Sequence, residues 1–203
     1  MSFFTENWFH NESCDRLAQL ARQVDHIPGV IIEIGSWEGK STCVLANAIR
    51  PRIVHAVDTW QGSPNEISAE LAAERDVHAT FANNVKVLTG GNVVEHRMGW
   101  REYMAGHGGP IALVFIDAEH TYREVYDTIT AVLPFMSPGG VICGDDATTR
   151  RLLGLSWNSC RRTSCCRAGT CGRGRHRRWQ PTTTGSHAHR RTSTCTCHGS
   201  SAW

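Results

Sequence analysis

Acidic residues end three short apolar runs of the sequence, and a glycine-rich turn follows another. Asp58 ends the second run, Asp117 ends the fourth, and the pair Asp145 and Asp146 ends the fifth. Runs of this kind are typical of buried strands in a parallel sheet, whose ligands bind outside the carboxyl ends of the strands. We therefore expect the turn and the acids to meet at one sheet edge and bind a ligand. The plainer alternative is that the acids cap helices and stay solvated.

The glycine-rich turn occupies residues 33–42, with the sequence EIGSWEGKST. A tryptophan stands where a dinucleotide fingerprint needs its second glycine, and only three residues separate Gly35 from Gly39, one fewer than in a P-loop. The remaining pattern, G-x-x-x-G, allows a nucleoside one close passage at Gly35 and offers the following helix N-terminus to a carboxylate. Asp58, 23 residues beyond Gly35, has the spacing of an acid that binds ribose hydroxyls.

Asp117, Asp145 and Asp146 should meet within a few ångströms, because strands four and five are neighbours in such a sheet. Like charges this close raise one another's pKa unless a cation lies among them. Oxygen ligands without a cysteine suit Mg²⁺, which keeps water ligands and accepts substrate oxygens. Alternatively, Asp146 caps the next element and only one or two of the acids bind anything.

His120 follows Asp117 by three residues and is placed to accept a proton. An unperturbed histidine has a pKa of ~6.5, which suits a general base. The alternative is that His120 is a helix N-terminal residue without a catalytic role.

The frame that would hold these residues alternates strands with helices. We expect buried strands at residues 30–34, 53–57, 92–98, 111–116 and 141–143. We expect amphipathic helices over residues 17–24, 67–83 and 122–133, the last opened by a capping box from Thr121 to Glu124. This alternation is the pattern of a parallel α/β sheet.

The 203 residues divide into two parts of opposite charge. Up to Ala147, ten basic residues and all 19 acids give a net charge of −9; from Thr148 to Trp203, eleven arginines and no acid give +11. The second part also lacks Val, Ile, Phe, Tyr and Met, so it cannot bury a core and should be disordered. We therefore predict a domain at 1–147 and a tail at 148–203.

The tail admits three interpretations. It could be an arginine-rich arm that binds nucleic acid, or a metal module, although its six cysteines lack the C-x₂-C spacing of zinc sites. It could also be GC-rich DNA translated out of frame, which its narrow composition favours.

The sequence excludes several classes of protein. No apolar run approaches the ~18 residues of a membrane span, and the first residues lack the basic region of a secretory signal. The three cysteines of the first part are isolated and are typical of reduced thiols. We expect a cytoplasmic protein without a membrane partner.

Four segments of the first part resemble, in order and with ordinary spacing, the motifs of the class I S-adenosylmethionine (SAM) methyltransferases. They are residues 33–42 (EIGSWEGKST), 57–62 (VDTWQG), 115–122 (FIDAEHTY) and 138–146 (PGGVICGDD). The branch shared with macrocin O-methyltransferase and cephalosporin hydroxylase-like proteins is the most similar. The resemblance implies an α/β fold, a Rossmann-like three-layer αβα sandwich with a mainly parallel sheet. We expect the sheet to be truncated after the fifth strand, because nothing after Ala147 has a strand pattern.

The same resemblance implies SAM as the methyl donor and, for this branch, a divalent metal. Residues that would contact SAM are Glu33, Gly35, Ser36, Gly39, Ser41 and Asp58, with Trp60 and Trp100 flanking the adenine. The metal ligands would be Asp117, Asp145 and Asp146. We therefore expect a Mg²⁺-dependent O-methyltransferase in which His120 takes the proton from a hydroxyl of a small molecule or sugar.

Two other functions stay open. The chain could bind SAM but catalyse nothing, because the elements that follow the fifth strand in this family are missing. It could instead modify RNA and hold it with the basic tail, although we expect no nucleic acid partner. The sequence does not identify the acceptor, and it is compatible with a homo-oligomer.

Overall fold

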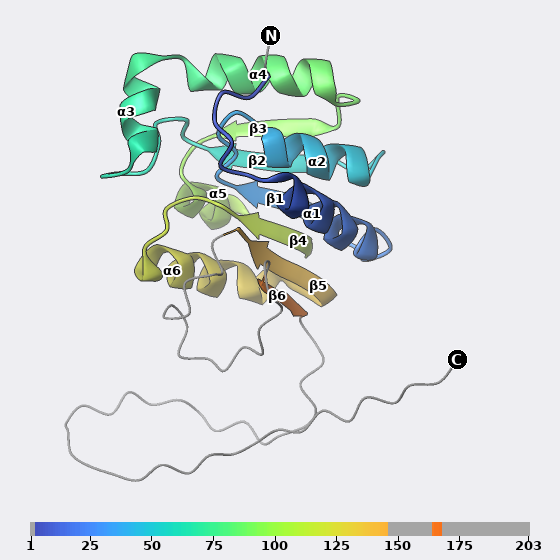
Figure 1. The fold of residues 1–203 in the computed structure, drawn as a ribbon. Helices are drawn as coiled ribbons and strands as arrows, with labels where there is room; N and C mark the ends of the chain where they lie inside the picture. The colour runs from blue at the N-terminus through green and yellow to red at the C-terminus, as the bar shows by residue number, and fades with distance from the viewer. Residues whose placement is uncertain (1–2, 146–163, 168–203) are drawn as a thin grey trace, which may run out of the picture. The chain divides into compact units, whose positions relative to one another are not determined.

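In the computed structural model, which describes residues 3–145 and 164–167, a six-stranded sheet has the order β3-β2-β1-β4-β5-β6 (Figure 1). The strands are β1 (Val30–Ile34), β2 (Val54–Asp58), β3 (Val93–Arg97), β4 (Ile111–Ile116), β5 (Met136–Gly144) and β6 (Ser164–Arg167). The first five strands pair in parallel, as predicted. The strand order reverses between β1 and β4, which is where sheets of this kind bind ligands.

Helices cover both faces of the sheet (Figure 1). They are α1 (Asn11–Gln23), α2 (Lys40–Ala48), α3 (Ile67–Glu74), α4 (Val77–Leu88), α5 (Trp100–Gly106) and α6 (Tyr122–Val132), followed by the short 3-10 helix η1 (Leu133–Phe135). Ile31 of β1 packs in one core cluster with residues of α1 and α2, and Ile32 packs in another with residues of α5 and α6. Alternate residues of a strand thus face opposite layers, which confirms the predicted three-layer sandwich.

Local capping explains where two of the helices begin. The Thr121 hydroxyl accepts a hydrogen bond from the Glu124 N–H at 3.3 Å, as the capping box predicted. The helix predicted over 67–83 is in fact two helices, because the Asp76 carboxylate accepts a hydrogen bond from the Ala79 N–H at 2.9 Å and so caps α4.

We expected the sheet to end after its fifth strand, but the structure adds a sixth strand, β6. It pairs antiparallel with β5, with Cys165 opposite Cys143. The sequence of residues 164–167 did not indicate a strand, because Ser, Cys and Arg are not strong strand formers. The predicted disordered tail, residues 148–203, includes Ser164–Arg167, which form β6 instead; the predicted boundary after Ala147 and the rest of the tail lie outside the described residues. None of the helices in the described part of the chain is long and apolar enough to cross a membrane.

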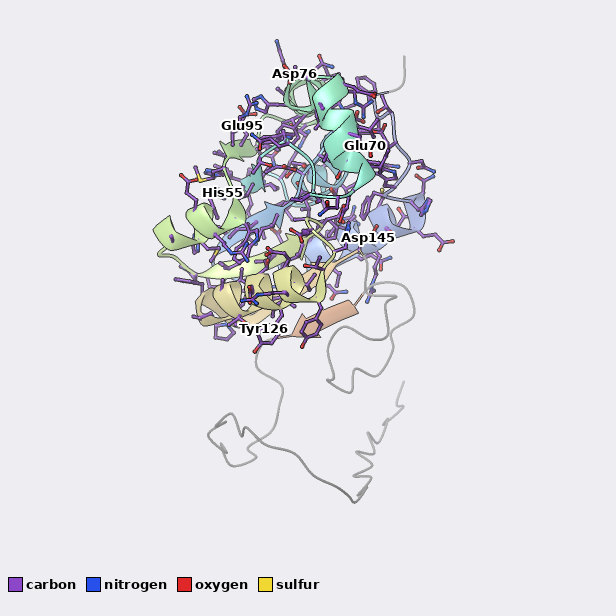
Figure 2. All side chains as sticks on the ribbon, turned by 90° about the vertical axis from the view of Figure 1, so that its left-hand side faces the viewer. His55, Glu70, Asp76, Glu95, Tyr126 and Asp145 are labelled. Atoms are coloured by element: carbon purple, nitrogen blue, oxygen red, sulfur yellow. The ribbon has the colours of Figure 1, made fainter. Side chains whose placement is uncertain are left out.

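Two histidines on neighbouring strands share a hydrogen bond. Nδ1 of His55 in β2, which Figure 2 labels, lies 3.0 Å from Nε2 of His96 in β3, and Tyr103 of α5 packs on both rings. Burial lowers the pKa of His55, as do the neighbouring His96 and His107, and burial lowers the pKa of His96. One of the two bonded nitrogens must accept, so the contact is lost when both rings are protonated.

We therefore expect the free energy of unfolding to fall as the pH drops below ~6.5, the ordinary histidine pKa. In this range the unfolded chain binds protons that the folded pair does not. His96→Asn should remove much of this loss, measured by urea unfolding at about pH 7.5 and about pH 5.5. His26→Asn, at an exposed position, is the control. A His96→Asn protein with the wild-type pH dependence would contradict the interpretation.

Candidate active site

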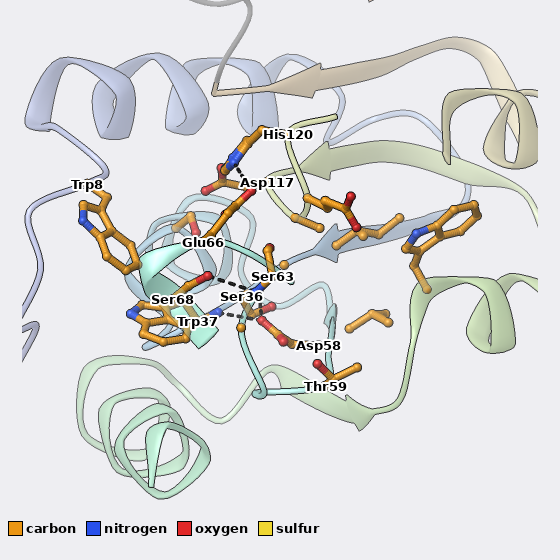
Figure 3. A pocket seen from close by; sticks show the side chains of 18 of the residues that line it. Trp8, Ser36, Trp37, Asp58, Thr59, Ser63, Glu66, Ser68, Asp117 and His120 are labelled. Atoms are coloured by element: carbon orange, nitrogen blue, oxygen red, sulfur yellow. Dashed lines mark hydrogen bonds and ion pairs between the residues drawn. The ribbon is translucent and has the colours of Figure 1, made fainter. Parts of the chain in front are cut away.

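A cavity of about 510 Å³ opens at the carboxyl ends of four parallel strands. Gly35 follows β1, Asp58 ends β2, Asp117 follows β4 and Asp145 follows β5, and all four line the cavity. The volume falls within the ~300–1,000 Å³ of small-molecule sites. The structure thus brings the glycine turn and three of the strand-end acids to one place, and Figure 3 labels two of these acids, Asp58 and Asp117.

The residues predicted to form the site fall into three groups. Those that line the cavity are Gly35, Ser36, Ser41, Asp58, Trp100, Asp117, His120 and Asp145. Glu33, Gly39 and Trp60 do not belong to the lining, and Asp146 lies outside the described residues. The cavity therefore joins most of the predicted cofactor residues to the predicted base and to two predicted metal ligands.

Gly35 lies where the end of β1 passes the end of β4. Its φ is +86°, and its N–H donates to the Val57 carbonyl at 2.9 Å. A β-carbon at this position would lie 2.2 Å from the carbonyl oxygen of Asp117. The end of the neighbouring strand β4 is therefore sufficient to require glycine here, whereas the requirement was predicted from the close approach of a ligand.

The Asp58 carboxylate holds together the loops that follow β1 and β2. Its Oδ2 accepts hydrogen bonds from the N–H groups of Ser36 at 2.7 Å and Trp37 at 2.9 Å, and its Oδ1 accepts one from Trp60 at 2.7 Å. Trp37 and Trp60 have φ values of +47° and +56°, a conformation that costs about 1–2 kcal/mol. Hydrogen bonds to a charged group, at about 1.5–3 kcal/mol each, offset this strain. Asp58 is thus a positioning residue for both loops.

Glu33 lies beneath the turn, fully buried, and not in the cavity. Its Oε2 accepts hydrogen bonds from Ser36 Oγ at 2.8 Å and from Thr42 Oγ1, while its Oε1 has no partner among the described residues. Burial raises the pKa of Glu33 to about 7, although the neighbouring hydroxyl groups of Ser41, Thr42 and Ser36 act to lower it. The carboxyl supports the turn from below. Gly39 likewise serves the turn, as the N-cap of α2.

The tryptophans near the cavity have different roles. Trp60, predicted to flank an adenine, is only 4% exposed and packs against Phe81, with ring centroids 4.8 Å apart. Trp100 lines the cavity, and its place beside the adenine stays a prediction. Trp37 and Trp8 also line it, with ring centroids 5.4 Å apart, and neither was predicted. Of the two predicted tryptophans, the cavity therefore keeps Trp100 and loses Trp60, and it gains Trp8 and Trp37.

His120 faces two carboxylates (Figure 3). Its Nδ1 lies 3.3 Å from Glu66 Oε1, and its Nε2 lies 3.8 Å from Asp117 Oδ1. Glu66 was not predicted, because it is 54 positions away in the chain and shares no motif with His120. Its place at the N-cap of α3 brings it to the cavity. An imidazole oriented by carboxylates in this way can accept a proton.

The N-terminal residues 3–9 contribute to the cavity and were also missed. Those that line it are Phe4, Glu6, Trp8 and Phe9. Arg75 holds the segment through Glu6 at 2.6 Å and also binds Glu38 at 3.1 Å. The Thr5 N–H donates to Glu38 at 2.7 Å. The apolar residues of this segment follow no regular period, so the sequence gave no sign of this role.

The predicted metal site is only partly within the described residues. Asp117 and Asp145 line the same cavity, whereas Asp146 is not described. In the part of the chain that the structure describes, no group of three or more His, Cys, Asp or Glu side chains is arranged to hold a metal ion. The magnesium site stays a prediction.

Residues 32–147 match the family described as a methyltransferase domain. The 8-demethyl-8-(2,3-dimethoxy-alpha-L-rhamnosyl)-tetracenomycin-C 4'-O-methyltransferase of Streptomyces olivaceus is 25% identical over 142 residues. The demethyldecarbamoylnovobiocin O-methyltransferase of Streptomyces niveus is 25% identical over 143 residues. Each match covers 60% of this chain and 54% of the relative, so the chain spans about half the length of the curated relatives it matches.

Solved structures share the fold at lower identity. The O-methyltransferase TomG of Streptomyces achromogenes, solved in complex with SAM, has a TM-score of 0.52 and 20% identity, over 67% of this chain and 56% of that one. Cofactor-bound Rv0187 from MTB has a TM-score of 0.53 and 22% identity, over the same shares of the two chains, 67% and 56%. These likenesses show that the arrangement of the first five strands is a methyltransferase fold.

Proposed function

The chain belongs to the class I SAM-dependent methyltransferases, and from this membership we propose that it transfers the methyl group of SAM to a hydroxyl group of a small molecule or sugar. The two curated relatives are O-methyltransferases, and the name of one contains a rhamnosyl group, which supports oxygen as the acceptor atom. The observation that carries the proposal is that one cavity holds the glycine turn, Asp58 and His120.

We assign the cofactor end of the cavity to the turn after β1 and to the end of β2. Gly35, Ser36 and Ser41 would hold the methionine part of SAM beside the N-terminus of α2, where a carboxylate is favoured. Asp58 Oδ1 accepts one hydrogen bond from the protein, so it retains a lone pair for a ribose hydroxyl. Trp100, the first residue of α5, would flank the adenine.

We assign the proton transfer to His120. Glu66 at 3.3 Å from Nδ1 favours the tautomer with the proton on that nitrogen, which leaves Nε2 as the acceptor. Bound SAM supplies an activated methyl group for the acceptor oxygen to attack. Transfer of the hydroxyl proton to His120 would keep that oxygen from becoming positively charged as the new bond forms.

We propose Mg²⁺ as the metal, held by Asp117, Asp145 and Asp146. An oxygen-only set of carboxylates fits a hard cation, and the two described members line the cavity that would hold the acceptor. When bound, the ion would lower the pKa of the acceptor hydroxyl.

Removal of the metal with EDTA is expected to abolish methyl transfer, measured as release of S-adenosylhomocysteine. Added Mg²⁺ should restore the activity of the wild-type protein but not that of Asp117→Asn, because an amide is a weaker ligand for a hard cation. Full activity in EDTA would remove the metal from the proposal.

Asp58→Ala tests the cofactor assignment. The loss of a charged acceptor should weaken SAM binding about ten- to a hundredfold, corresponding to ~1.5–3 kcal/mol, measured by calorimetry. Asp15→Ala, at an exposed position of α1, is the matched control. Circular dichroism of both variants separates weaker binding from unfolding. Wild-type SAM affinity in folded Asp58→Ala would contradict the assignment.

A further inference from the structure

The cavity is lined by many more carboxylates than cations, and we infer that it selects acceptors that carry no negative charge. Among the described residues, the carboxylates of the lining are Glu6, Glu38, Asp58, Glu66, Asp117, Glu119, Glu124 and Asp145, and the permanent cations are Lys40 and Arg101. With His120 neutral, these ten side chains carry a formal charge of −6. The inference rests on the proposed function, because it names the class of acceptor for that reaction.

Part of this negative charge is compensated within the protein. Arg75 pairs with Glu6 at 2.6 Å and with Glu38 at 3.1 Å. Arg101 pairs with Glu124 at 2.7 Å. The Asp58 carboxylate accepts three backbone N–H groups. These acids therefore contribute little to the field that an acceptor would meet.

Four further carboxylates line the cavity, those of Glu66, Asp117, Glu119 and Asp145, and two of them lie beside His120. Glu66 and Asp117 flank the imidazole at 3.3 Å and 3.8 Å (Figure 3), and Asp145 lines the same cavity. Glu119 is half-buried, and its side chain makes no hydrogen bond or ion pair with another described residue. Since His120 is the proposed base, the acceptor hydroxyl must come close to these carboxylates.

SAM brings one net positive charge, so the formal charge of the ten lining side chains is −5 with SAM bound, and −3 if a divalent cation is bound as well. A phosphate or carboxylate on the acceptor would face like charges across a site with limited screening, which opposes binding. An amine would be attracted, and the faces of Trp8 and Trp37 also favour neutral or cationic groups. Nucleic acid, with a phosphate at every nucleotide, is the acceptor that this cavity opposes most.

SAM and S-adenosylhomocysteine provide a matched pair of probes. They differ by one methyl group and by one positive charge at the sulfur atom, so the ratio of their dissociation constants reports the field near the reacting centre. Glu119→Gln should weaken SAM relative to S-adenosylhomocysteine by about two- to tenfold, and salt should reduce the wild-type ratio. Glu70→Gln is the control, because Glu70 is an exposed residue of α3 outside the lining (Figure 2).

Calorimetry distinguishes failure of the proposed function from failure of the inference about charge. If neither probe binds, the proposed function is wrong. If both bind and their ratio is unchanged by Glu119→Gln and by salt, the function stands and the inference about charge is overturned.

A second measurement addresses the acceptor itself. Glucosamine, glucose and glucose 6-phosphate share a ring and differ in charge, and their binding to the chain saturated with S-adenosylhomocysteine can be compared by saturation-transfer NMR. The phosphate is expected to bind at least about tenfold more weakly than the amine. Glu119→Gln should reduce this difference in affinity between the phosphate and the amine, and Glu70→Gln should not. Binding of the phosphate equal to or tighter than that of the amine overturns the proposal.

Discussion

Replacing Gly35 with alanine is expected to destabilise the protein by ~3–5 kcal/mol and to abolish SAM binding. The new β-carbon would lie 2.2 Å from the carbonyl oxygen of Asp117 and 2.5 Å from its carbonyl carbon. Backbone atoms at the end of β4 cannot move away without loss of the Asp117 N–H bond to Ile34 at 2.8 Å. The positive φ of +86° adds strain. Urea unfolding and calorimetry with SAM measure the two effects.

Gly91→Ala is the matched control for this substitution. Gly91 has a similar φ of +79°, but a β-carbon there would meet nothing within 4 Å. Gly91→Ala should therefore lower the free energy of unfolding only by the ~1–2 kcal/mol that the left-handed conformation costs. The difference between the two variants measures the overlap with Asp117. If Gly35→Ala were no less stable than Gly91→Ala, the close approach of β1 and β4 would not be what requires glycine.

Gly35 also shows how much of the site could be predicted from the sequence. The turn was predicted from its spacing, and its place at the sheet edge followed from the buried strand before it. The β4 strand was equally clear, because its first five residues are apolar and all are buried. The contact between Gly35 and Asp117 was not predictable, since it depends on how closely two strand ends approach in space.

The tryptophans show which part of the site could not be predicted from the sequence. Trp37 and Trp60 both lie in loops at strand ends, and no pattern distinguishes which of them faces the cavity. Phe81 of α4 decides the outcome, because it packs on Trp60 and buries it. Trp8 could not be assigned either, since its place depends on ion pairs that Arg75, distant in the chain, makes with Glu6 and Glu38. Residues outside the motifs enter the site through contacts of this long-range kind.

His120→Ala is expected to lower kcat by about 10²–10⁴-fold while leaving SAM affinity unchanged. The imidazole is the group placed to take the acceptor proton, whereas the turn after β1 is held by the carboxylates of Asp58 and Glu33. Turnover would be followed as S-adenosylhomocysteine release, and affinity by calorimetry. His26→Ala, at an exposed position far along the chain, is the control. Unchanged turnover would make His120 an ordinary helix N-terminal residue.

Glu66→Gln separates a base from the group that orients it. If Glu66 acts by holding His120 Nδ1 at 3.3 Å, its loss should lower kcat about tenfold in the wild-type background and have little effect on His120→Ala. Residues that act as one unit are strongly non-additive in this way. Additive losses would mean that Glu66 acts on the acceptor directly through its charge. The Glu66→Gln/His120→Ala double variant therefore tests whether the charge around the base and the proton transfer are one function or two.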